Sequence, residues 1–159
     1  MRFSSFMTAS LTAALLAAAP LASAQTTDRR VITLDGAKAI LAAAEAEAVK
    51  NKWTVAIAVV DESGNLIAFH RIDDTQVGSI DIALGKARTA ARMKRPTKAL
   101  EDAVAGGRTV MLAIEGIMPL EGGVPVMLDG RVIGAVGVSG VTSQQDAQVA
   151  QAGAAALKR

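Results

Sequence analysis

The chain has 159 residues, of which 51% are hydrophobic, 3% are aromatic and 20% are charged, and its formal net charge is +2. This length suits one domain with a real core, and the nearly neutral balance gives no support for nucleic acid as a general partner. The absence of cysteine excludes disulfides, thiolate metal sites and cysteine catalysis, and the scarcity of aromatic residues excludes stacking platforms for bases within one subunit.

The first 24 residues have the layout of a secretory signal peptide. Arg2 gives a positive start, Phe6 to Ala19 are apolar apart from three hydroxyl residues, and Ala22-Ser23-Ala24 forms a small-residue cleavage site before Gln25. The apolar stretch is short for a membrane span, and an uncleaved anchor fits the cleavage residues less well. We therefore expect a periplasmic or secreted protein with one domain over residues 25–159.

The first half of the mature chain predicts a helix followed by two strands. Thr33 can cap a helix over residues 34–50, where alanine and aliphatic residues recur at helical spacing. Residues 53–60 and 65–72 are rich in β-branched and apolar residues. The turn residues 61–64 between them predict a short hairpin.

A second helical segment follows a polar loop that ends at Ser79, which can cap it. Pro96 ends this helix or begins a short one that stops at Gly106-Gly107. Residues 109–114 can form a further strand. The expected buried face of the long helix is Ile80, Ala83, Leu84, Ala87, Ala91 and Met93.

The last part of the chain predicts a hairpin and a final helix. Residues 124–128 and 131–138 are apolar runs separated by Asp129-Gly130, which is a strong signal for a type I′ turn. Ser143, with Asp146 three residues later, can begin the last helix as a variant of the capping box. The order of the elements predicts an α+β fold, in which helices flank an antiparallel sheet.

Three glycines, Gly134, Gly137 and Gly140, fall at every third position in and just after the last predicted strand. A phosphate loop needs its glycines between a strand and a helix, so this spacing argues against a nucleotide site. Glycines inside a strand instead let another backbone or a flat ligand approach the sheet closely.

His70 is the only histidine of the chain. It alternates with apolar residues along its strand and can ligate a metal or a haem iron through one ring nitrogen. The commoner alternative is a histidine that is hydrogen-bonded near a strand end. No nucleophile elbow accompanies it, so a Ser-His-Asp triad is poorly supported.

A basic run places six positive charges within thirteen residues and includes no acid. Arg88 and Arg92 are one helical turn apart, and Arg95 can join them. They suit an anionic partner such as a carboxylate, or form a solvated helix face balanced by nearby acids, and both interpretations stay open. The six residues are Lys86, Arg88, Arg92, Lys94, Arg95 and Lys98.

Two carboxylate pairs, Asp73-Asp74 and Glu115 with Glu121, can in principle act as acid and base or bind a divalent ion. Neither pair has helical spacing or a histidine beside it. A solvated surface is therefore the more economical interpretation.

Several motifs together resemble a known family. They are V-V-D-x-x-G-x-L, K-A-x-T-A leading to R-P-T, and G-G-V-P…D-G…G-A-x-G-V-S-G with Q-D behind it, and they lie within Val59 to Thr97 and Leu120 to Leu157. This pattern resembles the GlcG/HbpS-like family, also called the haem-degrading or DUF336 family. That family includes the C-terminal domain of PduO-type corrinoid adenosyltransferases.

The resemblance implies a five-stranded antiparallel sheet of profilin-like type that assembles into dimers or larger rings. It also implies binding of haem, or of another tetrapyrrole such as a corrinoid, in haem handling or redox sensing. The family's usual R-M-D appears here as Arg71-Ile72-Asp73, which alters any contact that the methionine makes.

We accordingly predict an exported, oligomeric tetrapyrrole-binding protein with its site at a subunit boundary. His70 or the hydroxyl of Thr97 would bind iron, and arginines of the basic run would hold the propionates. The predicted cofactor site comprises His70, Arg71, Arg88, Arg92, Arg95, Thr97, Gly122 and Gly123.

Two functions of other classes stay open. One is an enzyme that acts on a small carboxylate metabolite in a pocket behind Glu121–Pro125, with Asp73 or Glu115 as base; a pocket too small for a porphyrin would favour it. The other is a ligand-free assembly or signalling partner of a membrane sensor protein.

Overall fold

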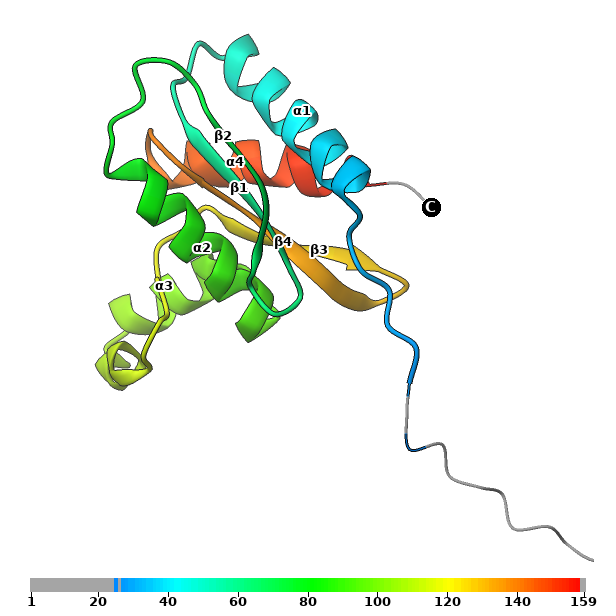
Figure 1. The fold of residues 1–159 in the computed structure, drawn as a ribbon. Coiled ribbons are helices and arrows are strands. Elements are labelled where there is room, and N and C mark those ends of the chain that lie inside the picture. The colour runs from blue at the N-terminus through cyan, green and yellow to red at the C-terminus, as the bar shows by residue number, and fades with distance from the viewer. Residues whose placement is uncertain (1–24, 26, 158–159) are drawn as a thin grey trace, which may run out of the picture.

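Residue 25 and residues 27–157 are described by a computed structural model, shown in Figure 1, in which helices lie on both faces of one antiparallel sheet. The predicted signal peptide lies outside the described residues. The elements in chain order are α1 (Leu34–Lys50), β1 (Ala56–Asp61), β2 (Leu66–Arg71), α2 (Ser79–Met93), α3 (Thr97–Ala105), the 3₁₀ helix η1 (Thr109–Ala113), β3 (Gly123–Leu128), β4 (Arg131–Ser139) and α4 (Ser143–Ala154).

The first helix forms as its sequence predicts. The Thr33 hydroxyl accepts a hydrogen bond from the Gly36 N–H at 3.1 Å, which satisfies one of the unpaired donors of the first turn. The predicted apolar stripe of α1 is buried: Ala37, Ile40, Leu41, Ala44 and Ala48. Among the described residues, no helix has both the length and the apolar character needed to cross a membrane.

The sheet has the order β2-β1-β4-β3, and every neighbouring pair is antiparallel. The central strand β1 is buried on both faces, which its unbroken apolar sequence predicts. One face packs against α1 and α4, and the other packs against the alanines of α2. A side chain on α1 and one on α2 therefore lie on opposite sides of the sheet (Figure 1).

The glycines of β4 admit another backbone, and that backbone is the chain's own helix α2. A Cβ atom on Gly137 would lie 2.1 Å from the Ala83 carbonyl oxygen and 2.4 Å from the Ala87 nitrogen. Gly140 is similarly covered by the Thr54 carbonyl oxygen, at 2.2 Å from such a Cβ. Close approach is thus confirmed, but these glycines do not form the open surface for a flat ligand that their spacing allowed.

The predicted strand over residues 109–114 is wrong. Residues 109–113 form η1, which buries none of its side chains and packs against α3. A strand needs a partner along the sheet, and the residues at this position find none. The described part of the chain therefore has a four-stranded sheet, where the family resemblance implied five strands.

Two predicted helix caps are displaced. The hydroxyl of Ser79 does not cap α2, whose N-cap is Gly78; it lies 3.3 Å from the Ser139 hydroxyl instead. The last helix is capped by Thr142 in a capping box with Gln145, one residue earlier than predicted. Asp146 is thereby freed for a different contact.

The edge strand β3 is protected against pairing with another strand. The Gly123 N–H, which points away from β4, donates a hydrogen bond to the Thr97 hydroxyl at 2.9 Å. Two residues later, Pro125 has no N–H to offer at the next outward position. Proline and a covering helix are common ways to blunt a sheet edge.

Candidate functional site

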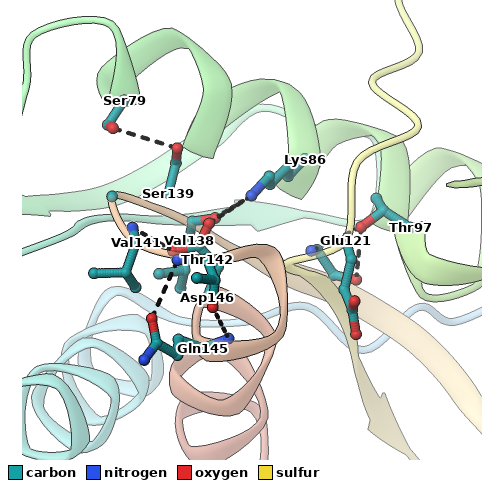
Figure 2. A network of polar contacts seen from close by, with 12 residues as sticks. Ser79, Lys86, Thr97, Glu121, Val138, Ser139, Val141, Thr142, Gln145 and Asp146 are labelled. Atoms are coloured by element: carbon teal, nitrogen blue, oxygen red, sulfur yellow. Dashed lines mark hydrogen bonds and ion pairs between the residues drawn. The ribbon is translucent and has the colours of Figure 1, made fainter. Parts of the chain in front are cut away.

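A buried ion pair joins α2 to α4 at the centre of the polar network in Figure 2. The Lys86 ammonium nitrogen lies 2.8 Å from an Asp146 carboxylate oxygen and donates to the Val138 carbonyl oxygen at 3.0 Å. Both side chains are only 3% exposed. Burial raises the pKa of Asp146 above its usual range, although the hydrogen bond and the charge of Lys86 act against that rise.

Sequence reasoning missed this pair because each partner had a plausible local role. Lys86 was counted with the basic run, and Asp146 was interpreted as part of a helix cap. The signal that could have found the pair is the family pattern, since Lys86 begins K-A-x-T-A and Asp146 ends the Q-D that follows the glycines.

The predicted residues Gly122, Gly123 and Thr97 come together beside this ion pair. A Cβ atom on Gly122 would lie 2.8 Å from the Lys86 ammonium nitrogen, and one on Gly123 would lie 2.4 Å from the Lys86 carbonyl oxygen. Gly122 also has a φ of +123°, which favours glycine. Thr97 is fully buried, and its hydroxyl accepts the Gly123 N–H, so an iron ion could reach that oxygen only by displacing Gly123.

The predicted arginines hold the turn between β1 and β2. Arg92 donates from Nε to the Ser63 carbonyl oxygen at 2.9 Å, and Arg88 donates from Nε to the Gly64 carbonyl oxygen at 3.3 Å. Arg95 instead bonds the Met93 carbonyl oxygen at 3.3 Å. All three side chains belong to exposed residues, so Arg88 and Arg92 keep guanidinium groups at the surface while they fix the turn.

His70 lies away from these arginines. Its Nδ1 is 2.7 Å from a Glu45 carboxylate oxygen of α1, and its side chain is half exposed. The pair is on the α1 side of the sheet, whereas Arg88 and Arg92 lie on α2 at the opposite face. The neighbouring Arg71 is exposed at the end of β2. One ligand cannot contact both His70 and the α2 arginines of the same chain.

A large groove opens beside the turn that the arginines hold. Its volume is about 860 Å³, and its walls are residues 27–30, the turn residues Glu62 and Ser63, Lys94 at the end of α2, and the hairpin residues 127–133. The hairpin contributes apolar side chains, of which Met127 is 52% exposed.

The rim of this groove carries four positive charges and three negative ones. Arg29 lies 3.8 Å from Glu62, and Arg30 lies 3.3 Å from Asp129. Lys94 and Arg131 add two further positive charges, and Asp28 adds the third acid. The net charge of the lining is therefore +1, so the groove offers cations to an anionic ligand.

A smaller pocket of about 360 Å³ lies where the sequence placed one, behind Glu121–Pro125. It is bounded by α3, by the start of β3 and by α4. Its charged and amide side chains are Lys98, Asp102, Glu121 and Gln151; it includes neither an arginine nor Asp73 or Glu115. The groups expected for an enzyme that acts on a small carboxylate are thus not in this pocket. Nowhere in the described chain do three histidine or acidic side chains gather as a metal site.

The chain is similar to a protein family and to several known proteins. Residues 32–155 match the family described as haem-degrading protein HbpS-like. Protein GlcG of Escherichia coli strain K12 is 50% identical over 109 residues, which are 69% of this chain and 81% of that protein. Corrinoid adenosyltransferase PduO of Salmonella typhimurium is 32% identical over 108 residues, which are only 32% of its length.

Solved structures agree with this assignment. A double mutant of HbpS from Streptomyces reticuli has a TM-score of 0.78 at 36% identity, covering 90% of this chain and 99% of that one. A structure of PduOC in complex with haem has a TM-score of 0.75 at 29% identity, covering 80% of this chain and 96% of that one. The protein belongs to the HbpS-like family, together with GlcG, and is related to PduO.

Proposed function

We propose that this protein is an exported, oligomeric tetrapyrrole-binding protein, with haem as the first candidate ligand and a corrinoid as the alternative. The observation that carries the proposal is the large groove beside the β1–β2 turn. Its volume of about 860 Å³ is in the upper part of the range of small-molecule and cofactor sites. A related structure is a haem complex, which supports the same class of ligand.

The lining of the groove fits the two chemical parts of a haem. The apolar side chains of the hairpin, among them Leu128, Val132 and Ile133, can cover the porphyrin ring. Lys94 and Arg131 can meet the propionates, because guanidinium and ammonium groups form charge-assisted hydrogen bonds with carboxylates. When bound, a haem would supply an iron centre, and the thioether of Met127 in the lining would be a candidate to hold that iron.

His70 can contribute to this site only from a second copy of the chain. His70 on β2 is the neighbour of Ile57 on β1, which in turn pairs with Val138 on β4. The groove lies at the other end of the sheet, where Asp61 of β1 pairs with Gly134 of β4. Four residues of strand span about 13 Å, too far for one side chain to bridge. A role for His70 therefore depends on an oligomer, in which the ligand lies at a subunit boundary.

The test is a titration of the protein, purified after export, with hemin, followed by the Soret band. We expect a saturable shift that changes position in Met127→Leu if the thioether binds iron, and in His70→Ala if a neighbouring histidine does. Glu115→Gln, an exposed change outside the groove, should leave the titration unchanged. The absence of any shift would overturn haem binding; if a titration with a corrinoid also gave no spectral change, tetrapyrrole binding would fall and the ligand-free assembly or signalling partner would be the better function.

Export and oligomer formation have their own tests. Cell fractionation should find the protein outside the cytoplasm with Gln25 as its first residue, and light scattering should give more than one copy per particle. A monomer that binds hemin and is unaffected by His70→Ala would exclude the subunit-boundary site while keeping the groove.

A further inference from the structure

The smaller pocket contains a buried carboxylate oxygen without a hydrogen-bond donor. Oε2 of Glu121 is shielded from solvent and has no partner among the described residues. An unpaired buried oxygen of a charged group is costly, and native proteins pair such atoms in the large majority of cases. No donor of the described chain reaches this oxygen, and because it is also shielded from solvent, a water or ligand in the pocket can meet it only after the Glu121 side chain turns toward the pocket.

The pocket has an excess of negative charge. Its lining carries one cation, Lys98, against the two acids Asp102 and Glu121. A third acid lies directly behind them, because a carboxylate oxygen of Glu101 accepts the Glu121 N–H at 2.6 Å. The net charge around the pocket is therefore −2, which favours a cation and disfavours the small carboxylate considered from the sequence.

Lys98 does not supply the missing charge. Its ammonium group is engaged with Asp102, one turn further along α3. The hydrogen bond to Asp102, together with the charges of Asp102, Glu121 and Glu101, raises the pKa of Lys98, which reflects the same negative surroundings.

The remaining walls suit a short aliphatic group. Pro96, Ala99, Val124 and Ala147 are apolar, and Gln151 offers one amide at the α4 side. The volume of about 360 Å³ is near the lower limit of ligand pockets, so it admits a small molecule and is less than half the volume of the groove.

We propose that this pocket binds a small organic cation of the primary ammonium class, whose N–H donors meet the Glu121 carboxylate while its aliphatic chain lies against the apolar walls. The site is separate from the haem groove: the pocket includes Gly123 and Val124 at the start of β3, and the groove includes Met127 and Leu128 at its end.

Two-dimensional amide NMR of the protein purified after export tests the proposal, with n-butylammonium as the probe and butyrate and 1-butanol as probes of matched size. Butylammonium should cause saturable shifts of the Gly122 and Gly123 amides, butanol much smaller ones, and butyrate none. Glu121→Gln keeps the size of the side chain and removes its charge, so it should weaken the binding of butylammonium at least about tenfold. Glu115→Gln, outside the pocket, is the matched control.

A second variant keeps the proposal falsifiable if Glu121→Gln does not fold. Lys98→Gln removes the one cation of the pocket and should strengthen butylammonium binding several-fold. Tighter binding of butyrate than of butylammonium, no saturable shift, or equal affinity in wild type and Glu121→Gln would each overturn the proposal. The hemin titration of Glu121→Gln should match that of the wild type, so failure here is distinguishable from failure of the proposed function.

Discussion

Lys86 and Arg92 belong to the same helix and the same basic run, yet the fold uses them in opposite ways. Lys86 is buried against Asp146 and a carbonyl oxygen, whereas Arg92 lies at the surface, where it holds the β1–β2 turn beside the groove. The difference arises because six residues along a helix place the two side chains on different faces. A dense run of like charges can therefore contain one buried residue, Lys86, among others whose charged groups stay at the surface.

The largest expected effect concerns the buried pair. Asp146→Ala leaves the Lys86 ammonium group buried without a counter-charge and should lower the free energy of unfolding by about 3–5 kcal/mol, measured by urea denaturation. Lys38→Ala, which removes an exposed pair with Asp35, should change it by less than about 1 kcal/mol. A double variant Lys86→Met with Asp146→Leu should recover most of the loss. If Asp146→Ala lowered the free energy of unfolding as little as Lys38→Ala does, the buried pair would contribute no more to stability than the exposed one.

The next effect concerns the close approach that buries α2 against the sheet. Gly137→Ala forces a methyl group against the backbone at Ala83 and Ala87, so it should cost stability in the upper part of the ~1–3 kcal/mol range of overpacked cores. Gly78→Ala is the control, because a Cβ atom there meets no atom within 4 Å. Thermal denaturation of both variants measures the difference. A Gly137→Ala protein as stable as the control would mean that α2 can move away from β4 freely.

The role of the exposed positive charges beside the groove is tested by measuring hemin affinity. The double variant Lys94→Gln with Arg131→Gln removes two positive charges from the rim of the groove. It should weaken hemin binding by up to about tenfold, and the remaining affinity should depend less on salt concentration than that of the wild type. Their removal should leave the unfolding free energy nearly unchanged, unlike the change at Asp146. Lys38→Gln, on α1 and outside the groove, should bind hemin as the wild type does. An unchanged affinity in the double variant would remove the groove as the propionate site.

The smallest effect is the pH dependence of the turn that the arginines hold. Burial opposes ionisation of Asp61, but hydrogen bonds from Asn65, Ser63 and Gly64 outweigh it and lower the pKa of this carboxyl. The stabilisation is therefore present above the usual carboxyl pKa of about 4 and is lost as the pH falls through the lowered value. Asp61→Asn should reduce stability by on the order of 1 kcal/mol near pH 7. The difference from wild type should vanish toward pH 2, and a difference that persists there would contradict this account.

The local elements were predictable because their signals are local. The cap at Thr33 and the hairpin turns at residues 61–64 and 129–130 depend on a few neighbouring residues, and each appears where the sequence placed it. The strand expected over 109–114 failed because a β-strand also needs a partner, which no local pattern reveals.

The candidate site was only partly predictable. The sequence brought Gly122, Gly123 and Thr97 into one motif set, and the structure does bring them together, but as packing around Lys86. The sequence alone could not show that His70 and the α2 arginines lie on opposite faces of the sheet, because their placement depends on which helix covers which face.

The sequence by itself determined the family, the antiparallel α+β order and the turns, because hydrophobic period, caps and glycine-rich motifs act over a few residues. Only the tertiary structure decided which lysine is buried and which backbone covers the glycines. It also decided where the positively charged groove and the negatively charged smaller pocket lie. These features depend on contacts between residues 60 or more positions apart, such as Lys86 with Asp146 and Arg30 with Asp129. Long-range contacts of this kind are set by the packing of helices on a sheet, and the periodicity of one segment carries no information about them.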